Sequence, residues 1–285
     1  MTTTDVTFNV EPAQQSRQRR LGRVGLYAGA IALTLFMLIP IYLIAIAAFS
    51  PRDAIYQYPK SVVPDQFSVD TMQFFVNSRG VLDSTRNSFL VGLLTLALSL
   101  LIGAPAGYAL ARFIFPGRDT FKMLILTTRA FPIVILSIPL AVNFIKWGLY
   151  DTLYGVALAH TALALPVTIL VTSSIFMGVS RELEEAALTL GCNRVQAFMK
   201  VALPLALPGL TASAIFTFVL SWNEVFAATI LTLRNRTLPA LVMSQLNDSP
   251  LYFRFAGGFF LVFPALIFIF LIRKYLLGMW GQVVK

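Results

Sequence analysis

The chain has 285 residues, of which 57% are apolar and only 12% are charged, and its mean hydropathy is +0.77. Ordinary soluble domains carry about a quarter charged residues, and a soluble fold of this length could not enclose so much apolar sequence. The composition therefore predicts a polytopic membrane protein and argues against a soluble enzyme. The net charge of +9 comes from basic residues in short clusters between apolar runs, which favours a membrane surface over nucleic acid as the partner.

Six apolar runs are long enough to cross about 30 Å of hydrocarbon as helices that rise about 1.5 Å per residue. They are residues 24–49, 88–111, 121–146, 153–177, 204–231 and 256–277. Because backbone groups in lipid must be hydrogen-bonded within their own segment, we interpret each run as a helix and its prolines as kinks. The predicted fold class is therefore all-α, with one membrane domain at residues 24–278 between polar tails at 1–23 and 279–285.

The positions of Lys and Arg predict the orientation of these spans. If the N-terminus is inside, the inner segments hold 13 of the 22 basic residues and the outer loops hold 8, while Arg129 is left within a span. The positive-inside rule then places both termini in the cytoplasm. Aromatic residues near the outer span ends would form an interfacial belt. They are Tyr56, Tyr58, Trp147, Tyr150 and Trp222.

The segment 180–203, between the fourth and fifth runs, shows a helix, a break and a second helix. One side of its first helix is predicted to be an apolar stripe with helical spacing. This stripe comprises Leu183, Ala186, Ala187 and Leu190. The opposite side comprises Glu182, Glu185 and Thr189. The pattern predicts a short amphipathic helix that lies across the inner face of the membrane.

The ends of these two short helices also carry sequence signals. Ser180 is a plausible N-cap of the first helix, and Gly191 suits the left-handed residue that ends it. Asn193 and Gln196, three residues apart, resemble a capping box that starts the second helix. This second helix is expected to continue into the fifth span.

The same segment resembles the EAA motif of the permease subunits of ABC importers. The matching residues are Glu185, Ala186, Ala187, Gly191, Phe198, Leu203 and Pro204. The rest of the chain, from about residue 20 to 285, is similar to the smaller permease of maltose-type carbohydrate importers. The residues that carry this second likeness are Phe131-Pro132, Pro139-Leu140, Gly148 to Thr152, Pro166 and Ser221 to Glu224.

This resemblance implies a type I ABC importer permease fold and a transport role in the bacterial inner membrane. The EAA segment would be the coupling helix, with Glu182 and Glu185 facing an ATP-binding subunit and Gly191 supplying the turn. No Walker sequence occurs in the chain, so ATP and Mg would be bound by a separate polypeptide. The implied partners are a second permease, two ATP-binding subunits, an external solute-binding protein, membrane lipid and a sugar or polyol, moved by alternating access.

Polar residues within the spans are candidates for the translocation path or the outer gate. Trp222, Asn223 and Glu224 offer an aromatic surface beside hydrogen-bonding groups, which suits a sugar, although an interfacial tryptophan at a polar helix end would give the same pattern. Arg129 could line the inner half of the path or extend to the lipid headgroups, and Asn143 lies at an unknown azimuth. In the resembled family the partner permease chiefly holds the sugar.

Two other functions are possible for a polytopic membrane protein of this kind. An ion-coupled secondary transporter should show paired intramembrane carboxylates or unwound half-helices, and the sequence offers only Arg129, Glu224 and His160, which are expected to be unpaired. An intramembrane enzyme should show a catalytic motif, and none is present. His160 is the only histidine and Cys192 the only cysteine, so the sequence predicts no metal site in this chain.

Overall fold

The computed structural model describes residues 12–59, 63 and 66–280, and this part of the chain contains helices and no strand, as predicted. The long helices are α1 (Pro12–Ala48), α3 (Val81–Arg112), α6 (Leu153–Met177), α9 (Leu203–Trp222) and α12 (Leu251–Trp280). The shorter α-helices are α2 (Asp70–Asn77), α4 (Arg118–Thr127), α5 (Ile133–Lys146), α7 (Arg181–Thr189), α8 (Arg194–Ala197), α10 (Phe226–Leu231) and α11 (Leu238–Ser244). The remaining helical turns are η1 (Arg52–Tyr56), η2 (Thr128–Ala130) and the π-helical η3 (Phe198–Ala202).

Four stretches of helix among the described residues are long and apolar enough to cross a membrane. They are Gly22–Ala48, Val81–Arg112, Leu153–Met177 and Arg194–Trp222, which contain or overlap the predicted first, second, fourth and fifth runs. The third run forms a bent helix pair, and Leu251–Ile267 of α12 is a shorter apolar helix. The structure therefore has the long apolar helices of a polytopic membrane protein, while the number of six spans stays a prediction.

The third run is not the single kinked helix that the sequence predicted. α4 and η2 end at Ala130, α5 begins at Ile133, and the two parts are bent by 86°. Phe131 has extended backbone, with φ −80° and ψ 119°. Pro132 follows it, and the ring of a proline disfavours helical geometry in the preceding residue. The proline thus breaks the helix here, whereas Pro139 lies within α5.

One other predicted boundary was also wrong. α1 begins at Pro12, so its helix extends back into the predicted polar tail, while its candidate span Gly22–Ala48 agrees with the predicted first run. The fifth run was predicted to continue to residue 231, but α9 ends at Trp222 and α10 is a separate helix. The predicted tail assignments for residues 1–11 and 281–285 lie outside the described residues.

Helices α3, α6 and α9 form the centre of the bundle. α3 and α6 approach closely at Gly107, where a Cβ atom would lie 2.1 Å from Thr172 Oγ1. At the same crossing the Thr172 hydroxyl donates a 2.9 Å hydrogen bond to the carbonyl of Gly103. Small residues and hydroxyl groups of this kind allow helices to pack where no hydrophobic effect drives them together. These contacts hold α3 and α6 as one rigid pair.

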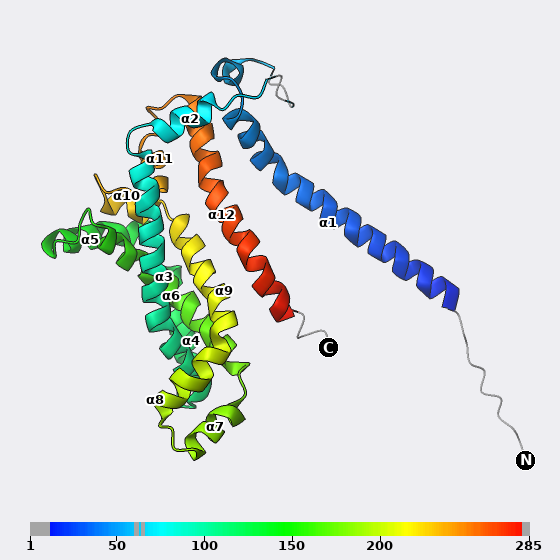
Figure 1. Cartoon of the computed structure of the whole chain (residues 1–285), viewed down its shortest axis with the longest axis vertical. Coiled ribbons are helices and arrows are strands. Elements are labelled where there is room, and N and C mark those ends of the chain that lie inside the picture. The colour runs from blue at the N-terminus through cyan, green and yellow to red at the C-terminus, as the bar shows by residue number, and fades with distance from the viewer. Residues whose placement is uncertain (1–11, 60–62, 64–65, 281–285) are drawn as a thin grey trace, which may run out of the picture.

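The bundle has two distinct ends, which we call the α7 end and the α2 end (Figure 1). The N-terminal end of α1 and the C-terminal end of α12 point towards the α7 end, as the predicted placement of both termini on one side requires. α1 leans away from the bundle, and no residue is buried in the most apolar 18-residue window of Gly22–Ala48. A helix that is apolar and uncovered needs an apolar environment such as lipid.

The loop between α10 and α11 is held by one carboxylate at the α2 end. Asp151 Oδ1 accepts hydrogen bonds from the backbone N–H groups of Leu233, Arg234 and Asn235 at 2.8, 2.9 and 3.0 Å. The Asn235 amide donates in return to the Asp151 carbonyl at 2.8 Å. Burial alone raises the pKa of Asp151, but these backbone donors and the charge of Arg234 outweigh it and lower the pKa below its ordinary value. We name residues 233–235 the clamped loop.

Replacement of Asp151 by Ala should release the clamped loop, because three backbone donors lose their common acceptor. We expect faster hydrogen exchange at residues 233–235 in the purified protein, with α3 and α6 unchanged. Because the carboxyl pKa is lowered, wild-type protection should persist through neutral and mildly acidic pH and be lost only as the pH falls through that lowered value. Equal exchange in the variant and the wild type would show that Asp151 does not hold the loop.

Candidate functional site

The segment 180–203 folds at one end of the bundle as helix, break and helix. Ser180 Oγ accepts from the N–H of Glu182 at 3.2 Å and caps α7. Asn193 and Gln196 form the reciprocal capping box that starts α8, with hydrogen bonds of 2.8 and 3.0 Å. α8 then runs through η3 into α9. All of the predicted caps are confirmed.

Gly191 ends α7 in the left-handed conformation that the sequence predicted, with φ +94°. A Cβ atom at this position would meet nothing within 4 Å. The N–H of Cys192 reaches back to the carbonyl of Ala187 at 3.0 Å, which satisfies one of the last carbonyls of the helix. Backbone conformation, rather than lack of space, is therefore the reason for a glycine here.

The buried face of α7 differs from the predicted apolar stripe. Leu183 and Leu190 are 49% and 86% exposed, so the stripe assigned to them is wrong. The buried residues of α7 are Glu184 and Ala187, which lie three positions apart on one face. Polar contacts to α3, rather than apolar packing, decide which side of α7 faces the bundle.

Glu184 anchors α7 and was not among the predicted coupling residues. Tyr108 Oη donates to Glu184 Oε2 at 2.7 Å, and Arg112 Nε donates to Oε1 at 2.8 Å. Arg112 also donates to the carbonyl of Val179 at 2.9 Å. The side chains of Arg112 and Glu184 are only 9% and 8% exposed. Two features of the sequence could have indicated this contact. Arg112 lies at the end of a predicted span, and Glu184 lies three residues before Ala187, on the same face of the helix.

The predicted coupling residues divide into an exposed and a packed group. Glu182, Glu185, Ala186, Gly191 and Pro204 are exposed. Phe198 packs its ring 4.6 Å from that of Tyr108, and Leu203 packs against the same core. The carboxylates of Glu182 and Glu185 thus face away from the bundle, while Phe198, Ala187 and Leu203 fasten the segment to it.

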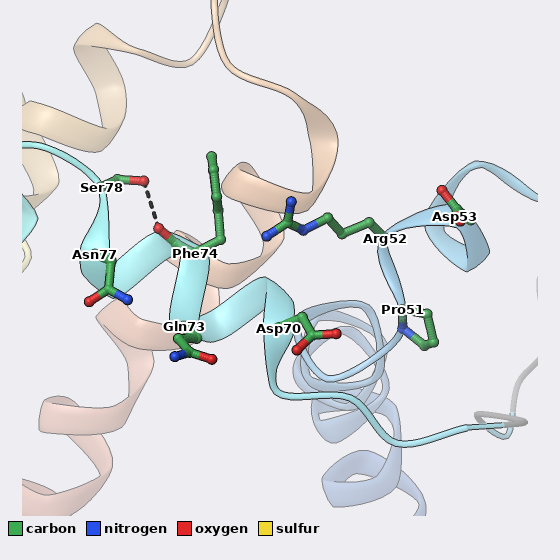
Figure 2. Close-up of a pocket in the computed structure, with 8 residues that line it drawn as sticks. All are labelled: Pro51, Arg52, Asp53, Asp70, Gln73, Phe74, Asn77 and Ser78. Carbon is green, nitrogen blue, oxygen red and sulfur yellow. Dashed lines mark hydrogen bonds between the residues drawn. The ribbon is translucent and has the colours of Figure 1, made fainter.

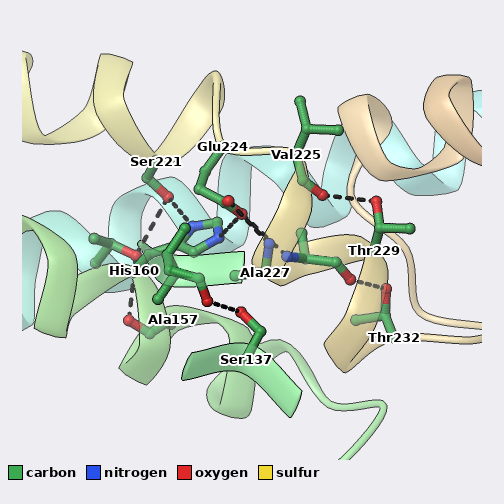
Figure 3. A network of polar contacts seen from close by, with 12 residues as sticks. Ser137, Ala157, His160, Ser221, Glu224, Val225, Ala227, Thr229 and Thr232 are labelled. Atoms are coloured by element: carbon green, nitrogen blue, oxygen red, sulfur yellow. Dashed lines mark hydrogen bonds and ion pairs between the residues drawn. The ribbon is translucent and has the colours of Figure 1, made fainter. Parts of the chain in front are cut away.

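A buried polar cluster joins α3, α6 and α9, and Figure 3 shows its members His160, Ser221 and Glu224. His160 is fully buried, with Nδ1 2.8 Å from Ser221 Oγ and Nε2 3.0 Å from Glu224 Oε2. Ser221 Oγ lies 3.3 Å from Thr95 Oγ1 on α3. The prediction that His160 and Glu224 are unpaired is therefore wrong, because the fold brings together two helices that are distant in the sequence.

Glu224 also explains why the fifth run breaks. Its two carboxylate oxygens accept from the N–H groups of Ala227 and Ala228 at 2.9 and 3.0 Å, at the start of α10. A carboxylate at this position satisfies free N–H groups of a new helix and favours its N-terminus. With three protein donors on one carboxylate, Glu224 is a structural link between α6, α9 and α10.

Trp222 does not offer the exposed aromatic surface, or the interfacial belt position, that the sequence predicted. Its side chain is 1% exposed, its ring packs against Phe89 and Phe218, and Nε1 donates to the carbonyl of Leu261 at 3.2 Å. Asn223, the next residue, is exposed. The ring therefore fastens α9 to α12, and of the three predicted neighbours only Asn223 presents its side chain to the surroundings.

The other predicted path residues do not gather with this cluster. Arg129 is exposed on η2, just before the break, and Asn143 is exposed on α5. Among the described residues no hydrogen bond or ion pair joins either side chain to His160 or Glu224. Within this same part of the chain, no group of three or more His, Cys, Asp or Glu side chains could hold a metal ion.

Replacement of Glu184 by Ala should strongly destabilise the protein, because Arg112 would stay buried without its partner. Breaking a buried ion pair in this way costs about 3–5 kcal/mol. Thermal unfolding of the purified protein measures this loss, with Glu185→Ala as the matched control on the same helix. The exposed Glu185 should change stability by no more than about 0.5 kcal/mol. Equal effects of the two variants would contradict the anchor.

Replacement of His160 by Ala should cost about 1.5–3 kcal/mol, the range for a hydrogen bond to a charged group. The double variant with Glu224→Ala should be less destabilised than the sum of the two single variants, by about 0.5–3 kcal/mol. Unfolding of the four proteins gives this coupling energy, and Asn223→Ala serves as a control on the exposed side. Strictly additive effects would show that the pair does not link α6 to α9.

Comparison with known proteins gives matches over most of the chain. The family described as "Binding-protein-dependent transport system inner membrane component" matches residues 99–277. The trehalose transport system permease protein SugB of Mycobacterium tuberculosis (strain CDC 1551 / Oshkosh) is 32% identical over 240 residues, which covers 80% of this chain and 88% of SugB. The diacetylchitobiose uptake system permease protein NgcG of Streptomyces coelicolor (strain ATCC BAA-471 / A3(2) / M145) is 29% identical over 276 residues, covering 95% and 91%.

The fold is also similar to that of a solved transporter. A chain of a bacterial ABC transporter involved in the import of the acidic polysaccharide alginate matches with a TM-score of 0.70 and 22% identity, over 95% of this chain and 99% of that one. At this identity the likeness supports the type I importer permease fold alone. Together with the sequence matches, it confirms the resemblance drawn from the EAA motif. The chain belongs to the family of binding-protein-dependent transport system inner membrane components, the permease subunits of ABC importers.

Proposed function

We propose that this chain is the permease subunit of an ATP-driven importer that takes up a carbohydrate delivered by an external solute-binding protein. Two relatives that align with at least 80% of the chain are named for transport of trehalose and of diacetylchitobiose. Sugars, oligosaccharides and sugar alcohols form the proposed substrate class. One observation carries the coupled mechanism. Helix α7 is anchored to the bundle by Glu184, while its carboxylates Glu182 and Glu185 face outwards.

The proposed assembly contains this chain, a second related permease, two ATP-binding subunits and the solute-binding protein, in the bacterial cytoplasmic membrane. The absence of a Walker sequence supports the assignment of ATP and Mg to the partner subunits. The uncovered apolar surface of α1 supports a place in lipid. The residues of this chain then have to transmit a movement and shape a passage.

The coupling step begins at the exposed face of α7. Glu182 and Glu185 would pair with basic groups of an ATP-binding subunit, and Gly191 would hold the turn that presents them. When that subunit moves, α7 moves with it. Because Arg112 and Tyr108 hold Glu184, the displacement passes directly to α3. Alternating access would then proceed as a rocking of packed helices.

The passage itself is proposed to involve Asn223 rather than its neighbours. Asn223 is exposed, whereas Trp222 and Glu224 are used in contacts to α12, α6 and α10. The amide of Asn223 has one oxygen acceptor and an NH₂ donor, which suits the hydroxyl groups of a sugar. Arg129 and Asn143 stay proposed path residues on the exposed side of the bent pair.

Reconstitution of the complete importer in vesicles tests this function. We expect ATP-dependent uptake of labelled trehalose or of another sugar in a panel. Glu185→Lys should lower both uptake and stimulated ATP hydrolysis about tenfold or more, since reversing one charge of a close pair costs about 2–5 kcal/mol. Asp248→Lys, the same charge change on an exposed residue towards the α2 end, is the matched control. Uptake driven by an ion gradient without ATP would support a secondary transporter instead.

Gly191 gives a second test of the coupling segment in the same vesicles. Gly191→Val should reduce stimulated ATP hydrolysis, because a β-branched residue with positive φ is strained by about 1–3 kcal/mol. Gly191→Asn should retain most of the activity, since asparagine tolerates the left-handed conformation. Full activity of both Glu185→Lys and Gly191→Val would refute the coupling role of this segment.

A further inference from the structure

The two ends of α1 lie in different surroundings, and the end of α1 at the α2 end is fixed to the bundle. Ala48, the last residue of the helix, is fully buried. The ring centroid of Phe49, the next residue, lies 5.0 Å from that of Phe259 on α12. Figure 2 shows Arg52 reaching towards Phe74 of α2, and its Cζ lies 4.7 Å from the Phe74 ring centroid. These contacts hold one end of α1 within the protein itself.

The N-terminal end of α1 has no comparable support among the described residues. All residues from 22 to 40 are exposed, and Figure 1 shows the helix diverging from the bundle towards this end. From Val24 to Ala48 the helix carries no charged residue. At about 1.5 Å per residue this stretch is about 37 Å long, enough to cross about 30 Å of hydrocarbon with some tilt. The N-terminal end of this stretch therefore reaches a membrane surface.

Four arginines, which we call the arginine cluster, lie at this end of α1. They are Arg17, Arg19, Arg20 and Arg23, and the whole of α1 contains no acidic residue. At about 100° per residue the four positions fall within about 160° of the helix circumference, so they share one side of the helix. Along the axis they cover about 9 Å, which is comparable with the headgroup layer of about 5–8 Å on each side of the hydrocarbon. The cluster is thus placed at the depth of lipid headgroups.

The surroundings of the arginine cluster favour lipid over a protein as its partner. Arg23 is exposed, and within the described residues no carboxylate pairs with it. Figure 1 shows the N-terminal end of α1 apart from α7, the helix proposed to meet the ATP-binding subunit. A bilayer, in contrast, surrounds an uncovered apolar helix at every depth. Groups of four or more Lys and Arg next to a span attract anionic lipids, and a guanidinium can donate two parallel hydrogen bonds to one phosphate.

We infer that the arginine cluster binds anionic phospholipid in the leaflet at the α7 end, and that this lipid holds the free end of α1. A headgroup with a net negative charge, such as phosphatidylglycerol, leaves its phosphate charge uncompensated for the arginines. The choline of phosphatidylcholine compensates the same phosphate, so that lipid gains less from the cluster. Protein contacts at the α2 end and lipid contacts at the α7 end then set the position of α1 together.

The experiment uses the full-length chain in lipid nanodiscs and measures which lipid lies next to α1. Cys192→Ser removes the only native cysteine, and Val24→Cys carries a fluorophore beside the arginine cluster. Quenching by brominated phosphatidylglycerol, relative to brominated phosphatidylcholine, gives the ratio of the two association constants. We expect a ratio of about five or more, since one basic residue near the surface contributes about fivefold. Leu43→Cys, an exposed position near the other end of α1, is the control label and should give a ratio of about one.

Replacement of all four arginines by Gln should lower the ratio at Val24→Cys to about one, while replacement by Lys should keep it above about three. Inorganic phosphate added at constant ionic strength should leave the ratio unchanged. Equal quenching by the two lipids when the native arginines are present, or a ratio that the Gln replacements do not lower, would overturn the inference. A ratio that phosphate abolishes would also overturn it, in favour of a site for a free anion. Loss of the ATP-binding subunits from the Gln variant, with no lipid preference at position 24, would overturn it in favour of a protein partner.

Discussion

The contact between Glu184 and the pair Arg112 and Tyr108 is the constraint on which the rest of this structure depends. A buried carboxylate without partners would be expensive, so α7 can settle only where the guanidinium and the phenol meet it. That contact decides which face of α7 is buried. As a result, Glu182 and Glu185 are exposed, and the segment resembling a coupling helix is presented outwards by a fixed support.

Helix α3 connects this anchor to the far end of the bundle. Tyr108 and Arg112 lie near its C-terminal end, while near its N-terminal end Asn87 donates to the carbonyl of Arg236 at 3.1 Å and Ser88 accepts from Leu238 N–H at 2.8 Å. Close packing with α6 at Gly107 stiffens the helix between these points. One continuous element therefore touches both the coupling segment and the α10–α11 connection, as a subunit that rocks between two states requires.

The family assignment changes the meaning of the buried polar residues. His160 and Glu224 form a buried polar pair rather than the pair of carboxylates expected of an ion-coupled transporter, and Glu224 also accepts hydrogen bonds from the start of α10. The chain belongs to a family of transport permeases rather than enzymes. In that setting the pair holds three helices together at a break in the fifth run.

The sequence by itself determined the features that depend on local chemistry. Apolar run length predicted four of the long apolar helices, and the capping residues Ser180 and Asn193 predicted the starts of α7 and α8. The spacing from Glu185 to Pro204 indicated the family. These signals could be read because each arises from residues within a few turns of one another.

Only the tertiary structure decided the features that depend on contacts between distant segments. Glu184 meets Arg112 across 72 positions, and His160 meets Glu224 across 64, so neither pairing has a local signature. The same holds for Trp222, whose surroundings come from α3 and α12. A charged or aromatic residue in an apolar run can face lipid, solvent or a partner with the same local pattern, and only the packing of the other helices selects among these.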